Sequence, residues 1–337
     1  MRGSKRGLRL SSFSHIGVAG AGAWGVALAI AASAGGRHVT LWGRDAEAMR
    51  VWRESRRGAR LPDARLPEAV AATGELAELA GCEAILIATP AQTTREIAAS
   101  IAALGAPRPL VICAKGIEAG THLFLSEVIS QAAPGWRRAV LSGPSFAVDV
   151  AAGLPTAVTL AAESKDLAVA LAETLKAPNL RLYHSTDLRG VELGGAAKNV
   201  LAIGCGVARG LELGASASAA LIARGFAELR RFGEACGAKP HTLMGLSGLG
   251  DLVLTCSSEQ SRNFSFGVAL GQGKSAAEAS AGKLAEGAAT ASALMALARQ
   301  KSVDMPICAT VEALIAGHMS ARAAVGGLLA RPQRGEA

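Results

Sequence analysis

Three glycines near the amino end of the chain have the spacing of a phosphate-binding loop. Gly20, Gly22 and Gly25 form the pattern G-x-G-x-x-G between a short apolar run, His15 to Ala19, and an Ala-rich apolar segment, Val26 to Ala34. The first glycine permits a tight turn, the second lets the backbone approach a pyrophosphate, and the third lets a helix pack close to a sheet. Free N–H groups and the dipole at the start of that helix favour an anion. The spacing therefore predicts a dinucleotide site.

The segments around this loop support the interpretation. Gly35 and Gly36 end the Ala-rich segment, and His38 to Trp42 has the composition of a second strand. A strand, a glycine turn, a helix and a strand at these distances are typical of a dinucleotide-binding βαβ unit. The alternative is an ordinary turn of an α/β protein, because a chain with 40 glycines produces chance matches. The βαβ context favours the dinucleotide site.

A lysine within an apolar segment is the sharpest candidate for acid–base chemistry. Lys198 lies between Gly and Ala residues on one side and Val200 to Ile203 on the other, in a segment that favours a helix from Val191 to Val207. Burial lowers the pKa of an ammonium group, which brings a lysine into the range where it exchanges a proton near neutral pH. The alternative is a lysine whose apolar stem crosses the helix surface and whose ammonium reaches water. The residues alone leave both open.

Two other segments place polar residues next to apolar runs, and a third places one in a turn. Lys115 directly follows the run Leu110 to Ala114, and Ser145 lies in a turn just after a shorter run that ends at Ser142. Asp251 lies in a Gly-rich turn, where it either caps the turn or orients a hydroxyl or a lysine.

A fourth segment has the composition of an anion-binding helix start. Ser261, Arg262 and Asn263 precede an apolar helical stretch, Phe264 to Leu270. Ser or Asn suits the N-cap of such a helix, whose free N–H groups attract an anion, and the planar guanidinium of Arg262 suits a phosphate. The alternative is a plain helix cap next to a surface arginine, and the local pattern does not separate the two.

The order of the apolar runs predicts the fold that positions these residues. Short apolar runs alternate with Ala-rich helical stretches as far as about Tyr183. The expected strands are residues 15–19, 38–42, 84–89, 110–114, 139–142, 156–160 and 180–183. We expect an α/β protein whose N-terminal, Rossmann-like part has a doubly wound, mostly parallel sheet. Ligands of such a sheet gather at the carboxyl ends of its strands, where Lys115 and the Thr89-Pro90 turn fall.

The strand pattern fades from Asp187 onward. The expected helices there are residues 191–207, 217–235, 284–299 and 309–315, in addition to the stretch 264–270. They predict an all-helical C-terminal domain. We therefore divide the chain into a basic disordered leader at 1–12, a dinucleotide-binding domain at 13–187 and a helical substrate domain at 188–330.

Composition narrows the class of protein. The chain has 337 residues, of which 50% are hydrophobic and only 18% charged, and this is enough for a sizeable core in two domains. The formal charge of +8 suits nucleic acid, a membrane surface or a small anionic ligand as partner, and we expect no nucleic acid because no basic stripe interleaves with aromatic residues. We interpret one arginine cluster as a solvated helix face and loop: Arg53, Arg56, Arg57, Arg60 and Arg65.

The sequence has no clear targeting segment and no clear disulfide or metal-binding pattern of cysteines. The basic N-terminus has no continuous apolar segment after it, which favours a leader over a signal peptide. No apolar run reaches transmembrane length without a glycine or a charge, so we expect no integral membrane segment and a cytoplasmic location. The six cysteines form no C-x-x-C pair and no metal-ligand spacing, so we expect buried, reduced thiols and no metal site.

Taken in order, these segments resemble one protein family. The matching segments are GAGAWGVALA, AKGIE, GPSFA, AAGLPTAV, ELGGAAKNVLAIGCG, Leu221 to Gly225, GLGDLVLTC, QSRN and Glu286-Gly287. They run from about Ile16 to Pro306, and their number and order are more specific than any single motif. The chain is similar to the bacterial-type NAD(P)-dependent glycerol-3-phosphate dehydrogenases.

The resemblance implies an activity and its setting. The family reduces dihydroxyacetone phosphate to sn-glycerol 3-phosphate with NADPH or NADH, reversibly, and supplies glycerophospholipid biosynthesis. Its members join a Rossmann domain to a helical domain and are usually homodimers. Arg44 precedes Asp45 after the second strand, and an arginine there accommodates the 2′-phosphate of NADPH, whereas a carboxylate favours NADH. We therefore expect NADPH to be preferred.

The resemblance also assigns roles to residues, with Lys198 as the acid–base residue. The implied substrate contacts are Lys115, Gly143, Ser145, Lys198, Asp251, Ser261, Arg262 and Asn263. The implied cofactor contacts are Gly20, Gly22, Ala23, Trp24, Gly25, Arg44, Lys115, Ala147, Arg262, Leu284 and Glu286. Two positions depart from the family pattern. Val26 stands where Thr is common, and Ala288-Ala289 stands where an aromatic or polar residue is common, which affects details of the cofactor flap.

Two other functions are also compatible with parts of this pattern. Another β-hydroxyacid-type dehydrogenase shares the Rossmann-plus-helical plan and a helix lysine, but it needs a carboxylate clamp in place of a phosphate site. A nucleotide-sensing regulator keeps the fold without turnover, and such a protein is free to lose Lys198, Asp251 and Arg262, which are all present here. Assays with ketone phosphates and with 3-hydroxy acids separate the three functions.

Overall fold

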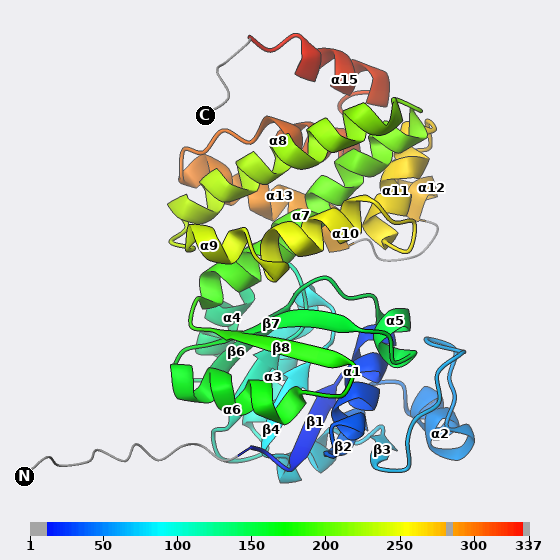
Figure 1. Ribbon diagram of the computed structural model, residues 1–337, viewed down its shortest axis with the longest axis vertical. Helices are drawn as coiled ribbons and strands as arrows, with labels where there is room; N and C mark the ends of the chain where they lie inside the picture. Colours follow the sequence, from blue (N-terminus) through cyan, green and yellow to red (C-terminus); the bar gives the residue numbers. More distant parts are fainter. Residues whose placement is uncertain (1–11, 281–285, 333–337) are drawn as a thin grey trace, which may run out of the picture.

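The computed structural model describes residues 12–280 and 286–332. The expected basic leader therefore lies almost entirely outside the described residues, and so does Leu284. A strand-rich part and a helix-rich part lie at opposite ends of the long axis of the molecule (Figure 1). The chain passes from the first to the second at the start of helix α7, at Leu188.

The strand-rich part contains one eight-stranded sheet of order β3-β2-β1-β4-β5-β6-β7-β8. The strands are β1 His15–Ala19, β2 His38–Trp42, β3 Val70–Thr73, β4 Ala84–Ile87, β5 Pro109–Ile112, β6 Arg137–Ser142, β7 Thr156–Ala162 and β8 Leu180–Ser185. All neighbouring pairs are parallel except β6 and β7. The expected doubly wound, mostly parallel sheet is confirmed. The edge strand β3 was not expected, because its four residues, V-A-A-T, form a very short run in which two strand-forming residues flank two alanines.

Helices cover both faces of this sheet. They are α1 Ala23–Ala34, α2 Ala46–Ser55, α3 Thr94–Ala102, α4 Leu125–Ala132, α5 Ala147–Ala151 and α6 Lys165–Leu175, with short 3-10 turns η1 Leu76–Gly81 and η2 Ala91–Thr93. Side chains of β4 alternate between the two faces. Leu86 packs in one core cluster with Val26 of α1, whereas Ile85 and Ile87 pack in the other cluster with Ile101 of α3. Burial on both faces explains the continuous apolar runs of these strands.

The second part is helical throughout its described residues. Its elements are α7 Leu188–Gly210, α8 Gly214–Ala235, α9 Pro240–Leu243, η3 Leu246–Gly250, α10 Asp251–Cys256, α11 Arg262–Gly271, α12 Ala276–Ser280, α13 Glu286–Gln300, α14 Pro306–Ile315 and α15 Ala321–Leu329. Helix α7 is the central one and contacts α8, α10, α11, α13 and α14. It lies very close to α11: a Cβ at Gly206 would lie only 2.1 Å from the Phe264 carbonyl oxygen. This packing explains how a chain poor in aromatic residues fills its core.

Helix α7 is also the single helix, within the described ranges, whose length and apolar character suffice to cross a membrane. Its best window has a mean hydropathy of 1.2, and 94% of that window is buried inside the protein. The apolar character of α7 is therefore accounted for by its place in the core. The six cysteines are free thiols, five of them buried and Cys236 half-buried.

Candidate active site

The glycine loop lies between β1 and α1, at the carboxyl edge of the sheet. Gly20 has a φ of +120°, and a Cβ there would lie 2.8 Å from the carbonyl carbon of Ala88. A Cβ at Gly25 would lie 1.8 Å from the Gly20 carbonyl oxygen, so α1 packs against the turn without room for a side chain. A Cβ at Gly22 would have no atom within 4 Å. The backbone is thus open to a ligand where a pyrophosphate is expected.

An open groove of about 660 Å³ extends from this loop. Its lining comes from the glycine loop, the end of β2, α2 with the loop after it, and the turn after β4: Gly20, Ala21, Gly22, Trp42, Gly43, Arg44, Asp45, Ala48, Met49, Val51, Trp52, Gly58, Ala59, Arg60, Thr89, Thr93, Glu96 and Ile97. The Asp45 carboxylate caps α2 by accepting a hydrogen bond of 3.0 Å from the Ala48 N–H. Arg44 is exposed at the groove. These residues fit a dinucleotide along its adenosine half.

Two buried polar atoms at the same edge of the sheet also point to a ligand. Trp24 Nε1 and Thr89 Oγ1 have no hydrogen-bond partner within the described part of the chain. Buried polar atoms are nearly always satisfied, by protein, water or ligand. Trp24 does not line the groove itself. Trp24 and Ala147 of α5 each pack against the same core cluster of the sheet.

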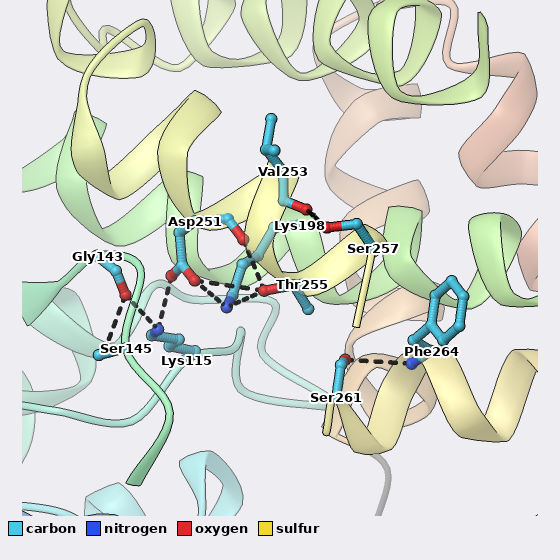
Figure 2. A network of polar contacts seen from close by, with 10 residues as sticks. All are labelled: Lys115, Gly143, Ser145, Lys198, Asp251, Val253, Thr255, Ser257, Ser261 and Phe264. Atoms are coloured by element: carbon cyan, nitrogen blue, oxygen red, sulfur yellow. Dashed lines mark hydrogen bonds and ion pairs between the residues drawn. The ribbon is translucent and has the colours of Figure 1, made fainter. Parts of the chain in front are cut away.

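The carboxyl edge also carries a cluster of charged side chains, buried or half-buried, that meet from three parts of the chain (Figure 2). The Lys198 ammonium on α7 donates to Asp251 Oδ1 of α10 at 2.5 Å. The Lys115 ammonium, in the loop after β5, donates to Asp251 Oδ2 at 2.6 Å and to the Gly143 carbonyl at 3.3 Å. One carboxylate therefore pairs with both lysines.

Glycines of the E-L-G-G-A-A-K-N segment make room for this cluster. A Cβ at Gly195 would lie 2.7 Å from Ser142 Oγ and 3.3 Å from the Lys115 stem, so a side chain there would displace Lys115. A Cβ at Gly194 would lie 2.5 Å from the Ser247 carbonyl oxygen of η3, the turn that leads into Asp251. The two glycines therefore let α7 pack closely against the Lys115 stem and against the turn that leads into Asp251.

Burial makes Lys198 suited to proton exchange. Lys198 is 5% exposed and Asp251 is 1% exposed, so the surface-lysine alternative does not describe this side chain. Burial lowers the pKa of Lys198 to about 8, the charge of Asp251 opposes this shift, and the charge of Lys115 adds to it. An ammonium group with this pKa is a proton donor that also deprotonates near neutral pH.

Thr255 is a part of this cluster that sequence analysis missed. Its hydroxyl accepts from the Lys198 ammonium at 2.7 Å and donates to the Asp251 carbonyl oxygen at 2.6 Å. The signal was available, because a residue four positions after Asp251 on a helix lies on the same face. Thr255 thus holds the lysine and its carboxylate in one arrangement.

The expected phosphate segment forms the start of α11. Ser261 is its N-cap, with its hydroxyl accepting from the Phe264 N–H at 3.2 Å, and Arg262 is exposed in the first turn. Asn263 Oδ1 accepts from the Gly287 N–H of α13 at 2.9 Å. Ser145 Oγ donates to the Gly143 carbonyl at 3.0 Å.

Glu286, the first residue of α13, interacts electrostatically with this segment and with the lysine cluster. Burial raises the pKa of Glu286, and the positive charges of Arg262, Lys115 and Lys198 oppose the shift. The carboxylate of Glu286 therefore interacts electrostatically with Lys198, Lys115 and Arg262.

A dinucleotide-type groove at the glycine loop, together with a buried lysine with a pKa of about 8 at the carboxyl edge of the same sheet, is the arrangement of an NAD(P)-linked dehydrogenase. Two family models match the chain: the NAD-dependent glycerol-3-phosphate dehydrogenase N-terminus over residues 15–168 and the corresponding C-terminus over residues 187–326. The chain belongs to the NAD(P)-dependent glycerol-3-phosphate dehydrogenase family.

Relatives with this name match over nearly the whole chain. A glycerol-3-phosphate dehydrogenase [NAD(P)+] of Azorhizobium caulinodans is 57% identical over 97% of this chain and 100% of its own length. The enzyme of the same name from Methylobacterium radiotolerans is 56% identical over 97% of this chain and 99% of its own. A crystal structure of glycerol-3-phosphate dehydrogenase from Coxiella burnetii has a TM-score of 0.90 and 38% identity, and covers 94% of this chain and 99% of that one.

Proposed function

We propose that this protein reduces dihydroxyacetone phosphate to sn-glycerol 3-phosphate with NAD(P)H, and that it also runs the reverse reaction. The observation that carries the proposal is the pairing of buried Lys198 and half-buried Lys115 with buried Asp251, at the edge of the sheet where the glycine loop lies. Family membership supports the choice of substrate. A β-hydroxyacid dehydrogenase would need a carboxylate clamp in place of the phosphate site proposed here.

The catalytic step uses positive charge that is already in place. Bound NAD(P)H supplies the hydride that reduces the ketone carbon. As negative charge develops on the ketone oxygen, the Lys198 ammonium donates a proton to it, and the Lys115 ammonium stabilises the same charge. Asp251 holds both ammonium groups, which keeps them oriented before substrate arrives. In the oxidation direction neutral Lys198 accepts the proton of the alcohol.

The substrate phosphate binds at the start of α11. Ser261 uses its hydroxyl oxygen to accept from Phe264, so the hydroxyl hydrogen is available to a phosphate. Asn263 uses its amide oxygen toward Gly287, so its amide N–H groups are available as well. Arg262 adds a planar guanidinium, which bonds a phosphate through two parallel N–H groups.

NADPH is the preferred cofactor in this proposal. Asp45, the acidic residue nearest the end of β2, already uses its carboxylate to cap α2. Arg44 next to it is exposed at the groove, where its charge suits the extra phosphate of NADPH.

The setting of the enzyme is proposed on the family resemblance. We place the domain boundary near residue 187, in line with the end of β8 at Ser185 and the start of α7 at Leu188. We propose a cytoplasmic homodimer that supplies glycerophospholipid biosynthesis. Light scattering of the purified protein tests the dimer, and a measured mass of one chain would contradict it.

The direct test is an assay of purified protein with NADPH and dihydroxyacetone phosphate. We expect NADPH oxidation that depends on the ketone phosphate, with sn-glycerol 3-phosphate as the product. Keto acids of similar size serve as controls and should give little turnover. Turnover with the keto acids instead would support the β-hydroxyacid dehydrogenase. Binding of NADPH without turnover of any ketone phosphate would support a nucleotide-sensing regulator.

A further inference from the structure

The outer wall of the groove comes from the connection between α2 and β3. Gly58, Ala59 and Arg60 of this connection line the same groove as Arg44, which follows β2. Residues separated in the chain therefore present two arginines to one cavity. From the sequence, Arg60 was expected only to be part of a solvated arginine cluster.

The connection is anchored at its base by Arg56. This residue ends α2 with a φ of +59°, and its guanidinium donates to the carbonyl oxygens of Leu66 at 3.2 Å and Val70 at 2.9 Å, and to that of Pro67. The Leu66 N–H donates back to the Arg56 carbonyl at 2.9 Å. The expectation that Arg56 belongs to a solvated face was wrong, because the loop carbonyls that it satisfies exist only in the folded chain.

Packing against α2 fixes the part of the connection next to Arg60. A Cβ at Gly58 would lie 2.3 Å from the Trp52 ring, so the backbone of the connection rests directly on that side chain. Leu61 is 6% exposed and belongs to the same core cluster as Trp52. Arg60 therefore lies between two anchored residues, Gly58 and Leu61, and their packing against Trp52 and the core fixes the backbone of Arg60 at the groove.

Two arginines, Arg44 and Arg60, and two carboxylates, Asp45 and Glu96, line the groove. Arg44 and Arg60 are both exposed, and neither has an ion-pair partner among the residues that the structure describes. Asp45 is engaged as the cap of α2. Two guanidinium groups at one cavity attract an anion with two negative charges more strongly than either does alone.

We infer that Arg60 and Arg44 together bind the 2′-phosphate of NADPH, so that Arg60 is a further determinant of cofactor choice in this chain. The inference rests on the proposed function for the identity of the cofactor. A phosphate monoester has three oxygens for charge-assisted hydrogen bonds, and guanidinium groups from two sides suit it geometrically. NADH has no group at that position, so the contribution of Arg60 is specific to NADPH.

The test is the binding of two cofactor fragments to the intact protein by calorimetry. 2′,5′-ADP carries the 2′-phosphate and 5′-AMP lacks it. We expect Arg60→Ala to weaken binding of 2′,5′-ADP by about tenfold, and to leave binding of 5′-AMP within about twofold. Arg53→Ala is the matched control, because Arg53 is exposed on α2 but does not line the groove. The control should bind both fragments like the parent.

Other results would overturn the inference. Equal weakening of both fragments by Arg60→Ala would mean that the substitution disturbs the groove, and no weakening would mean that Arg60 lies free in solvent. The proposed function fails separately: a parent protein that does not oxidise NADPH with dihydroxyacetone phosphate contradicts it whatever the fragments show. A parent that binds the two fragments equally contradicts the NADPH preference itself.

Discussion

The molecule holds positive charge in two different ways at one edge of its sheet. At the buried cluster, Lys198 and Lys115 share the carboxylate of Asp251, and all three come from different elements. At the groove, Arg44 and Arg60 are exposed, with no ion pair found in the described ranges of the chain. The two lysines share one carboxylate as an ion-pair partner, whereas the two arginines are available to a ligand.

This difference indicates what each region contributes. Buried charges interact strongly and depend on one another, because removing one partner leaves the other uncompensated in a low dielectric. Exposed charges are screened by water and salt, so each contributes a smaller and more independent amount. We therefore expect substitutions in the buried cluster to change rate or stability severely, and substitutions at exposed positions to change the affinity for one ligand.

The largest effect is expected at Lys198. Lys198→Met removes the proton donor, and turnover should fall by roughly 10²–10⁴. The fold and cofactor binding should survive, because Asp251 keeps Lys115 as its partner. Lys198→Arg should not restore turnover, since a guanidinium does not release its proton. The measurement is kcat for ketone reduction together with NADPH affinity by fluorescence. A Met variant with a kcat within a few-fold of the parent would show that the proton comes from elsewhere.

Stability should depend most on Asp251. Asp251→Asn leaves two lysines facing each other without a counter-ion, and loss of one partner of a buried ion pair costs about 3–5 kcal/mol. The deficit should shrink as pH rises, because neutral Lys198 needs no carboxylate. Denaturant unfolding at several pH values measures this, with Asp63→Asn as a control, since Asp63 is exposed. A deficit no larger than that of the control would separate Asp251 from the stability of the cluster.

Arg262 should affect the affinity for substrate more than the rate. It is exposed at the start of α11, so its contribution is that of a charge-assisted bond to a phosphate, about 1.5–3 kcal/mol. Arg262→Ala should raise the KM for dihydroxyacetone phosphate about tenfold to a hundredfold, and Arg262→Lys should recover little of this. The affinity for NADPH is measured alongside. A near-normal KM would return Arg262 to the surface-arginine alternative.

The last prediction concerns the dependence of activity on pH and needs no substitution. The pKa of Lys198 is lowered to about 8, and reduction needs the ammonium form whereas oxidation needs the amine. Accordingly, kcat/KM for ketone reduction should fall as pH rises through about 8, and kcat/KM for alcohol oxidation should rise over the same range. The two profiles are measured in matched buffers. Parallel profiles for both directions would exclude Lys198 as the titrating group.

Local patterns were sufficient to predict most of the fold. Buried strands such as β4 and β5 are continuous apolar runs, and the G-x-G-x-x-G spacing reports a turn whose geometry needs glycine. Helix α7 was recognised in the same way, although its ends lie three residues beyond the expected ones. Strand β3 was missed because pairing with β2, and not its own composition, makes it a strand.

For the site too, some features could be predicted from local sequence and others could not. Sequence by itself determined which segments are candidates for chemistry, because a lysine in an apolar helix or an arginine at a helix start is visible in a few neighbouring residues. Only the tertiary structure decided which of them meet: Lys198 and Lys115 reach Asp251 across 53 and 136 residues of chain. It also decided that Arg56 is anchored while Arg60 lies at the groove. The physical reason is that burial and ion pairing depend on distances in space, which local composition does not encode.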